Sequence, residues 1–224
     1  MHYGLTQYAD SPTLTVVSLA DAKLHLRVDF NDDDALINSL IDAATLQAEA
    51  YCKAAFTPRN YLMTLGAWPA LGAGSFGPGE DYIDFPARFG GSGRPSRYPD
   101  AICLPVAPVS AVTSITYLES TAGAVTTLSA SAYVVVTSHA QPMIVPATGQ
   151  SWPALYDHPE AVRIAFRAGY EADVPANVTA AVRLLVGHLY EHREEVTTGF
   201  GGAAPTQIPL GAKYLLNPHR MFPL

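Results

Sequence analysis

The sequence predicts an α+β fold. We expect a small helical bundle, with three main helices and a short C-terminal helix, that carries an inserted antiparallel β subdomain and a long Gly/Pro-rich loop. Apolar residues recur at spacings of three and four in the first and last quarters of the chain, as on one face of a helix. The middle of the chain is rich in β-branched and alternating apolar residues, which favour strands. Glycines and prolines concentrate between Gly66 and Pro108, where they interrupt regular structure.

Composition limits the function. The chain has 224 residues, 49% of them apolar and 15% charged, as in globular proteins. Its formal net charge of −7 argues against a surface that coats nucleic acid, because phosphate binding needs clustered lysines and arginines. Cys52 and Cys103 are the only cysteines, and we predict two buried thiols rather than a disulfide, as in a reducing compartment. With no long apolar run and no signal-peptide pattern, we expect a soluble protein that is not exported.

The N-terminal helical part, residues 1–58, is predicted to hold two helices. Ser18 is a good N-cap for a short first helix, and Asp21 is placed to reach back to its amide. The second helix is predicted at about 32–55, after a run of acidic residues. One face of that helix is apolar and comprises Leu36, Ile37, Leu40, Ile41, Ala44, Ala48, Tyr51 and Cys52.

The β-rich insertion, residues 59–172, is predicted to form a small antiparallel sheet around the long loop 66–100. Turn-rich residues separate several of its strands. The candidate strands are 61–65, 82–85, 101–104, 112–119, 132–137 and 162–166.

The last two parts are a core helix, 173–196, and a C-terminal tail, 197–224. The helix is predicted to begin near Pro175, since proline is favoured in the first helical turn. Its apolar side comprises Val178, Val182, Leu185, Val186, Leu189 and Tyr190. A Gly-rich hinge, 197–205, then leads to a short helix, 210–216, within a tail that is apolar and mildly basic.

His188, Glu191 and His192 spell the H-x-x-E-H pattern of one metalloprotease class, in which two histidines four residues apart bind zinc. A zinc hydrolase with Glu191 as its base is therefore one alternative. That class also uses a downstream carboxylate as third ligand, and no Asp or Glu follows Glu195. The preferred interpretation is a helix C-terminus, where histidines suit the helix dipole.

The run 29–34 partly imitates a calcium loop, but Asp34 occupies the position of the required glycine and Leu40 that of the bidentate glutamate. Helix capping explains the acidic run better. The sequence holds no G-x-S-x-G elbow and no phosphate-binding Gly-rich loop. We therefore predict no enzyme and no cofactor.

A second alternative is a binding module, which would use aromatic residues to recognise a host glycan or another protein. The aromatic residues concerned are Trp68, Trp152, Tyr156 and Tyr170. Isolated aromatics beside prolines more often anchor loops onto a core.

Several segments, in order along nearly the whole chain, resemble the head-tail connector (adaptor) proteins of long-tailed bacteriophages and gene transfer agents. They are 17–28, 32–37 with the helix to Tyr51, 102–110, 112–117, 149–153, 168–170, 174–175, 185–194 and 215–220. The stretch 66–100 departs from the pattern by being longer and richer in glycine.

The resemblance implies a non-enzymatic subunit of a homo-oligomeric ring, typically of twelve copies, in the virion neck. The ring would sit beneath the portal protein and above tail-side neck, stopper or terminator proteins, with assembly in the bacterial cytoplasm and no membrane. Genomic DNA would pass through it without sequence-specific binding, helped by the acidic charge. The residues expected to dock on the portal are Ile208, Leu210, Tyr214, Leu215, Leu216, Arg220 and Phe222. The residues expected on the helices that build the ring are Leu36, Leu40, Val182, Leu185 and Leu189.

Overall fold

The computed structural model describes residues 3–7, 15–69, 100–120, 123–138, 141–192 and 209–221. The α+β class is confirmed, and the chain divides into two compact units. The helical unit comprises Pro12–Thr57 and Tyr170–Arg220, and the sheet unit comprises Met1–Ser11, Pro58–Gly169 and Met221–Leu224. The two units therefore interleave along the chain.

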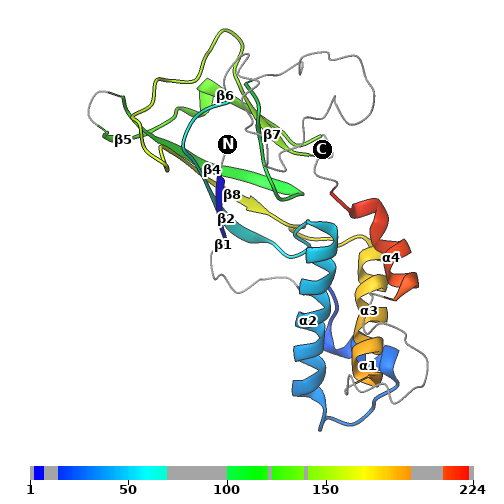
Figure 1. Ribbon diagram of the computed structural model, residues 1–224. Helices are drawn as coiled ribbons and strands as arrows, with labels where there is room; N and C mark the ends of the chain where they lie inside the picture. The colour runs from blue at the N-terminus through cyan, green and yellow to red at the C-terminus, as the bar shows by residue number, and fades with distance from the viewer. Residues whose placement is uncertain are drawn as a thin grey trace, which may run out of the picture. The chain divides into compact units, whose positions relative to one another are not determined.

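The helical unit contains four helices: α1 (Leu19–Leu26), α2 (Asp34–Cys52), α3 (Ala176–Glu191) and α4 (Leu210–Leu216). A 3-10 turn, Asn217–His219, follows α4 directly. The longest helices, α2 and α3, pack against each other, and α4 packs against α3 (Figure 1). The C-terminal end of α4 also reaches the end of α2, where the Cys52 thiol lies 3.6 Å from the Leu216 carbonyl oxygen.

One apolar core holds these helices together. It draws on the segment before α1 and on all four helices, because each presents residues at helical spacing to the same interior. Its fully buried members include Ile37, Ala44, Cys52, Phe56, Val178, Val182, Leu185, Val186, Ala212 and Leu216.

The helix starts differ in detail from the sequence predictions. Ser18 caps α1 as predicted, accepting a hydrogen bond from the Asp21 amide at 3.1 Å, but the Asp21 carboxylate accepts from the Ser18 hydroxyl and not from its amide. Asp33 occupies the cap position of α2 and makes no side-chain cap bond, so the capping part of the prediction for the acidic run is wrong. Asp34 lies in the first turn of α2, where a carboxylate suits the helix dipole as predicted. Pro175 is itself the cap residue of α3, one position before the helix.

The sheet unit contains two antiparallel sheets instead of the single sheet predicted. The first has the order β1-β2-β8-β4-β5 and the second the order β3-β7-β6. The strands are β1 (Tyr3–Gln7), β2 (Arg59–Leu65), β3 (Ile102–Cys103), β4 (Val109–Leu118), β5 (Val125–Thr127), β6 (Tyr133–Val136), β7 (Met143–Pro146) and β8 (Val162–Ala168).

Strand β8 is the centre of the larger sheet, pairing with β2 on one side and β4 on the other. Alternate residues of β2 and β8 are buried, as expected for a sheet with one face on a core. Tyr61 and Phe166 stand opposite each other in the ladder, and their rings stack with centroids 5.4 Å apart. This cross-strand pair anchors the apolar face.

The predicted strands 61–65, 101–104, 112–119, 132–137 and 162–166 correspond to β2, β3, β4, β6 and β8. The predicted strand 82–85, most of the loop 66–100 and the hinge 197–205 lie outside the described residues.

Cys52 is fully buried, as predicted, whereas Cys103 is only half-buried. No helix among the described residues is long and apolar enough to cross a membrane.

Candidate functional site

The short helix α4 is an integral part of the helical unit. Ala212 and Leu216 are fully buried in its core, and Leu215 packs against that core in a half-buried position. The prediction that Leu216 docks on a portal is not supported by this burial, since the side chain already serves its own subunit. Ile208 and Phe222 lie outside the described residues.

The turn after α4 is fixed by polar contacts to α2. The Tyr51 hydroxyl donates to the Asn217 side-chain oxygen at 2.8 Å, and the Arg220 guanidinium lies 5.1 Å from the centroid of the Tyr51 ring, a cation-π geometry. Beneath them the Cys52 thiol lies 3.6 Å from the Leu216 carbonyl oxygen. Burial raises the pKa of Cys52 to about 11, and the positive charge of Arg220 partly opposes that shift.

The same turn also meets the start of α3. His219 Nε2 lies 2.9 Å from the Asn177 side-chain oxygen, while the Asn177 amide nitrogen donates to the Leu215 carbonyl at 3.3 Å. Burial lowers the pKa of His219, because a charged imidazolium would lose hydration there. Residues 210–220 are therefore held to α2 and α3 by both apolar and polar contacts.

The outward side of α4 is apolar and exposed. Leu210 and Tyr214 lie one helical turn apart and are 68% and 69% exposed. Leu184 of α3, 40% exposed, lies beside them, because a Cβ added to Gly211 would be 3.7 Å from its Cδ1. We call Leu184, Leu210 and Tyr214 the α4 face. Half-buried Lys213 precedes Tyr214 in the helix.

A second exposed apolar surface lies on α2. Leu46 is 54% exposed and points away from the buried face of the helix. Ala43 and Ala50 flank it at helical spacing, and Asp42 lies one turn before it. All three flanking residues are exposed. We call Asp42, Ala43, Leu46 and Ala50 the α2 face.

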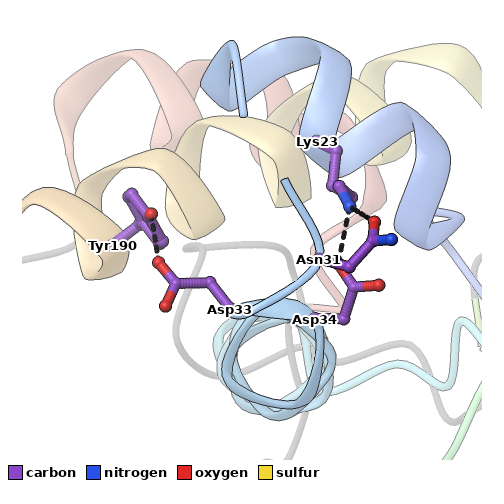
Figure 2. Close-up of polar contacts among 5 residues, drawn as sticks. All are labelled: Lys23, Asn31, Asp33, Asp34 and Tyr190. Atoms are coloured by element: carbon purple, nitrogen blue, oxygen red, sulfur yellow. Dashed lines mark hydrogen bonds and ion pairs between the residues drawn. The ribbon is translucent and has the colours of Figure 1, made fainter. Parts of the chain in front are cut away.

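The acidic run before α2 positions the loop between α1 and α2. The Lys23 ammonium of α1 binds the side-chain oxygens of Asn31 and Asp34, each at 2.7 Å, and the Tyr190 hydroxyl of α3 donates to Asp33 at 2.5 Å (Figure 2). Three helices thus meet on this loop. Its oxygen atoms are used for tertiary contacts, which explains why Asp33 leaves the α2 cap unmade.

The histidine pair shows no assembled metal centre. The rings of His188 and His192 have centroids 4.5 Å apart, and a ring nitrogen of His192 lies 3.0 Å from the His188 carbonyl oxygen. Across the described parts of the chain, no three His, Cys, Asp or Glu side chains are grouped so as to hold a metal ion. Within the described residues, His188 and His192 therefore lie at a helix end, as in the preferred interpretation.

The residues predicted to lie on the ring-building helices differ in how deeply they are buried in their own subunit. Val182 and Leu185 are fully buried in the helical core, so neither is available to a neighbour. Leu40 and Leu189 are half-buried against that core, and Leu36 is half-buried. Sequence periodicity identified the packed faces of α2 and α3 but missed Leu46 and Leu184. Both are leucines that fall outside the apolar spacing of their helix, and this position could have indicated that they are exposed.

The aromatic residues considered for ligand binding anchor loops. In the sheet unit the Trp68 and Trp152 rings stack at 4.7 Å, and their N–H groups donate to the carbonyl oxygens of Pro153 and Asp100, each at 2.8 Å. Satisfied indole donors in a stacked pair are typical of a structural cluster. Tyr170 belongs to the helical unit, where it stacks on Phe56.

Comparison with known proteins finds a likeness to one family over part of the chain. Residues 16–116, which span α1, α2 and β2 and extend into β4, match the model of the family described as "Phage gp6-like head-tail connector protein". The matched residues make up slightly less than half of the chain. A search of curated proteins finds no match.

Solved structures extend the likeness to nearly the whole chain. A protein in "Neck of empty GTA particle computed with C6 symmetry" is 25% identical, with a TM-score of 0.67 over 98% of this chain and 96% of that one. The fold also occurs in "Virion of native gene transfer agent (GTA) particle", at 24% identity, TM-score 0.66, and coverage of 97% and 95%. A third protein with the fold is in "Neck of native GTA particle computed with C12 symmetry", at 23% identity, TM-score 0.65, and coverage of 98% and 96%.

Proposed function

We propose that copies of this connector subunit close into a ring in the neck of a phage-like particle, beneath the portal protein and around the channel through which DNA leaves. The observation that carries the proposal is the likeness, over 98% of the chain, to a protein in the neck of a gene transfer agent particle computed with C6 symmetry. Twelve copies fit this symmetry and the C12 symmetry of the related neck. The role needs no catalytic residue.

The charge of the subunit suits a channel through which DNA slides. At −7 per chain, a ring of twelve would be strongly acidic, and an acidic wall repels phosphates instead of binding them. Assembly would take place in the cytoplasm of the bacterial host, with the portal on one side of the ring and neck, stopper or terminator proteins on the tail side. No membrane is involved in the proposal.

Docking on the portal is assigned to Arg220 and the residues that follow it. The burial of Ala212 and Leu216 makes α4 part of the subunit, so a docking tail begins after the turn Asn217–His219. Arg220 is exposed, and its positive charge lies at the end of a segment that contains no Asp or Glu. Leu210 and Tyr214 remain exposed candidates for contact with another protein of the neck.

The ring is tested by imaging particles that contain this chain. We expect density for the subunit in a cyclic ring at the junction of capsid and tail. A neck without it, in particles that contain the protein elsewhere, would refute the proposed function.

The docking tail is tested by deletion. Removing residues 221–224 and replacing Arg220 with alanine should leave the helical core intact and yield heads without tails. The matched control removes 221–224 alone and separates the contribution of Arg220. Removing 208–224 is a poor test, because the loss of Ala212 and Leu216 damages the core itself. Normal tailing by the Arg220 variant would exclude docking through this segment.

A further inference from the structure

A cyclic ring needs two different complementary surfaces on each subunit, because every subunit offers one surface to the neighbour ahead and another to the neighbour behind. The two must lie on different sides of the subunit, or the assembly cannot continue around the ring. The inference below rests on the proposed ring and names those surfaces.

The helical unit has two exposed apolar surfaces on different helices. The α2 face and the α4 face belong to helices that both pack on α3, and each face points away from the core that these helices share (Figure 1). Leu46 is 54% exposed on the first, and Leu210 and Tyr214 are more than two-thirds exposed on the second. The three large apolar side chains of the α4 face lie together, as in an interaction surface, whereas Leu46 is the one large exposed apolar residue described on α2.

The two faces differ in shape in a way that suits direct contact. On the α4 face, Leu210 and Tyr214 project one turn apart from a short helix. On the α2 face, Leu46 stands between Ala43 and Ala50, and the small alanine side chains leave space on either side of it. Large side chains of one helix fit the spaces between those of another when two helices pack.

The charges of the two helices are also complementary. Helix α2 carries no lysine or arginine, and Asp42 is its exposed carboxylate, since Glu49 is buried and Asp34 pairs with Lys23. Residues 209–221 carry Lys213 and Arg220 and no Asp or Glu. Asp42 is exposed beside Leu46, and Lys213 precedes Tyr214, so the charges accompany the apolar residues. Complementary charge fixes the register of an interface and disfavours contact between two like faces.

We infer that the α4 face of each subunit packs against the α2 face of the next subunit in the ring. Leu210 and Tyr214 insert beside Leu46, and Lys213 comes close to Asp42. A second copy of this chain is favoured over the portal as the occupant because its α2 face supplies an exposed leucine between small side chains together with the exposed carboxylate of Asp42.

Cross-linking tests the contact in assembled particles. In a chain with Cys103→Ala, the pair Leu46→Cys and Tyr214→Cys places one thiol on each face, while native Cys52 is buried and slow to react. A short bis-maleimide should then produce a ladder of covalent dimers, trimers and larger species. Each single-cysteine variant should stay monomeric, because its thiols never meet.

The outcomes separate this inference from the proposed function. A symmetric ring in the neck with no ladder would overturn the inference and leave the function standing. A dimer formed by the Leu46→Cys variant alone would show that like faces meet, and a Tyr214→Cys link to the portal protein would assign the α4 face to the portal. Both results would also overturn the inference. A neck without the protein would refute the proposed function itself.

Charge reversal gives an independent test. Asp42→Lys and Lys213→Glu should each lower the number of particles with a complete ring about tenfold, since each places like charges in contact. The double variant restores an opposite-charge pair at every contact and should recover within about twofold of the unaltered chain. Failure of the double variant to recover, with all three variants folded by circular dichroism, would overturn the contact.

Discussion

Replacing Leu216 with alanine should destabilise the helical unit by about 3–5 kcal/mol. Leu216 is fully buried on α4, and the substitution removes three carbon atoms, each worth about 0.8 kcal/mol of transfer free energy. The cavity left in a core built from four helices adds the rest. Leu210→Ala is the matched control on the same helix, because Leu210 is 68% exposed and its loss should cost about 0.5 kcal/mol or less.

Urea unfolding measures the difference. Far-UV circular dichroism follows the helices, while tryptophan fluorescence reports on the sheet unit alone, since Trp68 and Trp152 both belong to it. We expect the midpoint of the circular dichroism transition to fall in Leu216→Ala and to stay in place in Leu210→Ala. Equal midpoints for the two variants would refute the conclusion that α4 is part of the core.

Three further predictions concern buried polar groups of the helical unit. Glu49→Ala should lower the free energy of unfolding by about 2–5 kcal/mol, because it leaves the buried amides of residues 56 and 57 without their acceptor. The control Asp42→Ala, at an exposed position of the same helix, should change it by about 0.5 kcal/mol or less in the same urea assay. In a Cys103→Ala chain, Cys52 should resist maleimide at neutral pH until the protein unfolds. Burial raises the pKa of Cys52 from 9.0 to about 11, so the thiol ionises at lower pH in the unfolded chain than in the folded one. The free energy of unfolding should therefore fall as the pH rises from 9.0 to about 11, and Cys52→Ala should abolish this fall. Burial lowers the pKa of His219 from 6.5 and so favours its neutral form in the folded protein. The stability that this group contributes should be complete above pH 6.5 and fall below it. His219→Gln should remove this loss when the free energy of unfolding is measured above and below pH 6.5.

The sequence predicted the helices well, because their patterns are local. The spacing of Ile37, Ile41, Ala44 and Ala48 is enough to define the buried side of α2. Strands with clear alternation, such as β2 and β8, were also found. β1, β5 and β7 were missed: β5 has only three residues and β7 ends in a proline, so neither carries a usable pattern. The order β1-β2-β8-β4-β5 depends on pairing between distant segments and has no local signal.

The candidate site was less predictable than the fold. The sequence of a short apolar tail does not show which residues face a partner and which face the core of their own subunit. Leu216 and Tyr214 were therefore predicted to dock together, although Leu216 is buried and Tyr214 is exposed. The acidic run before α2 was assigned to capping because it lies directly before the apolar series that predicts the helix. Its real partners, Lys23 on α1 and Tyr190 on α3, become apparent only when the helices are in place.

The interleaving of the two units also bears on how such a protein changes over generations. The backbone passes between the units at four points, near residues 11, 57, 169 and 220. Recombination that exchanged the helical unit for that of another connector would need a breakpoint at each of them, within one gene. A longer segment needs only one insertion, and residues 66–100 fall inside a single sequence segment of the sheet unit. Lineages of this protein should therefore diverge readily in their loops while the two units are inherited as a single block.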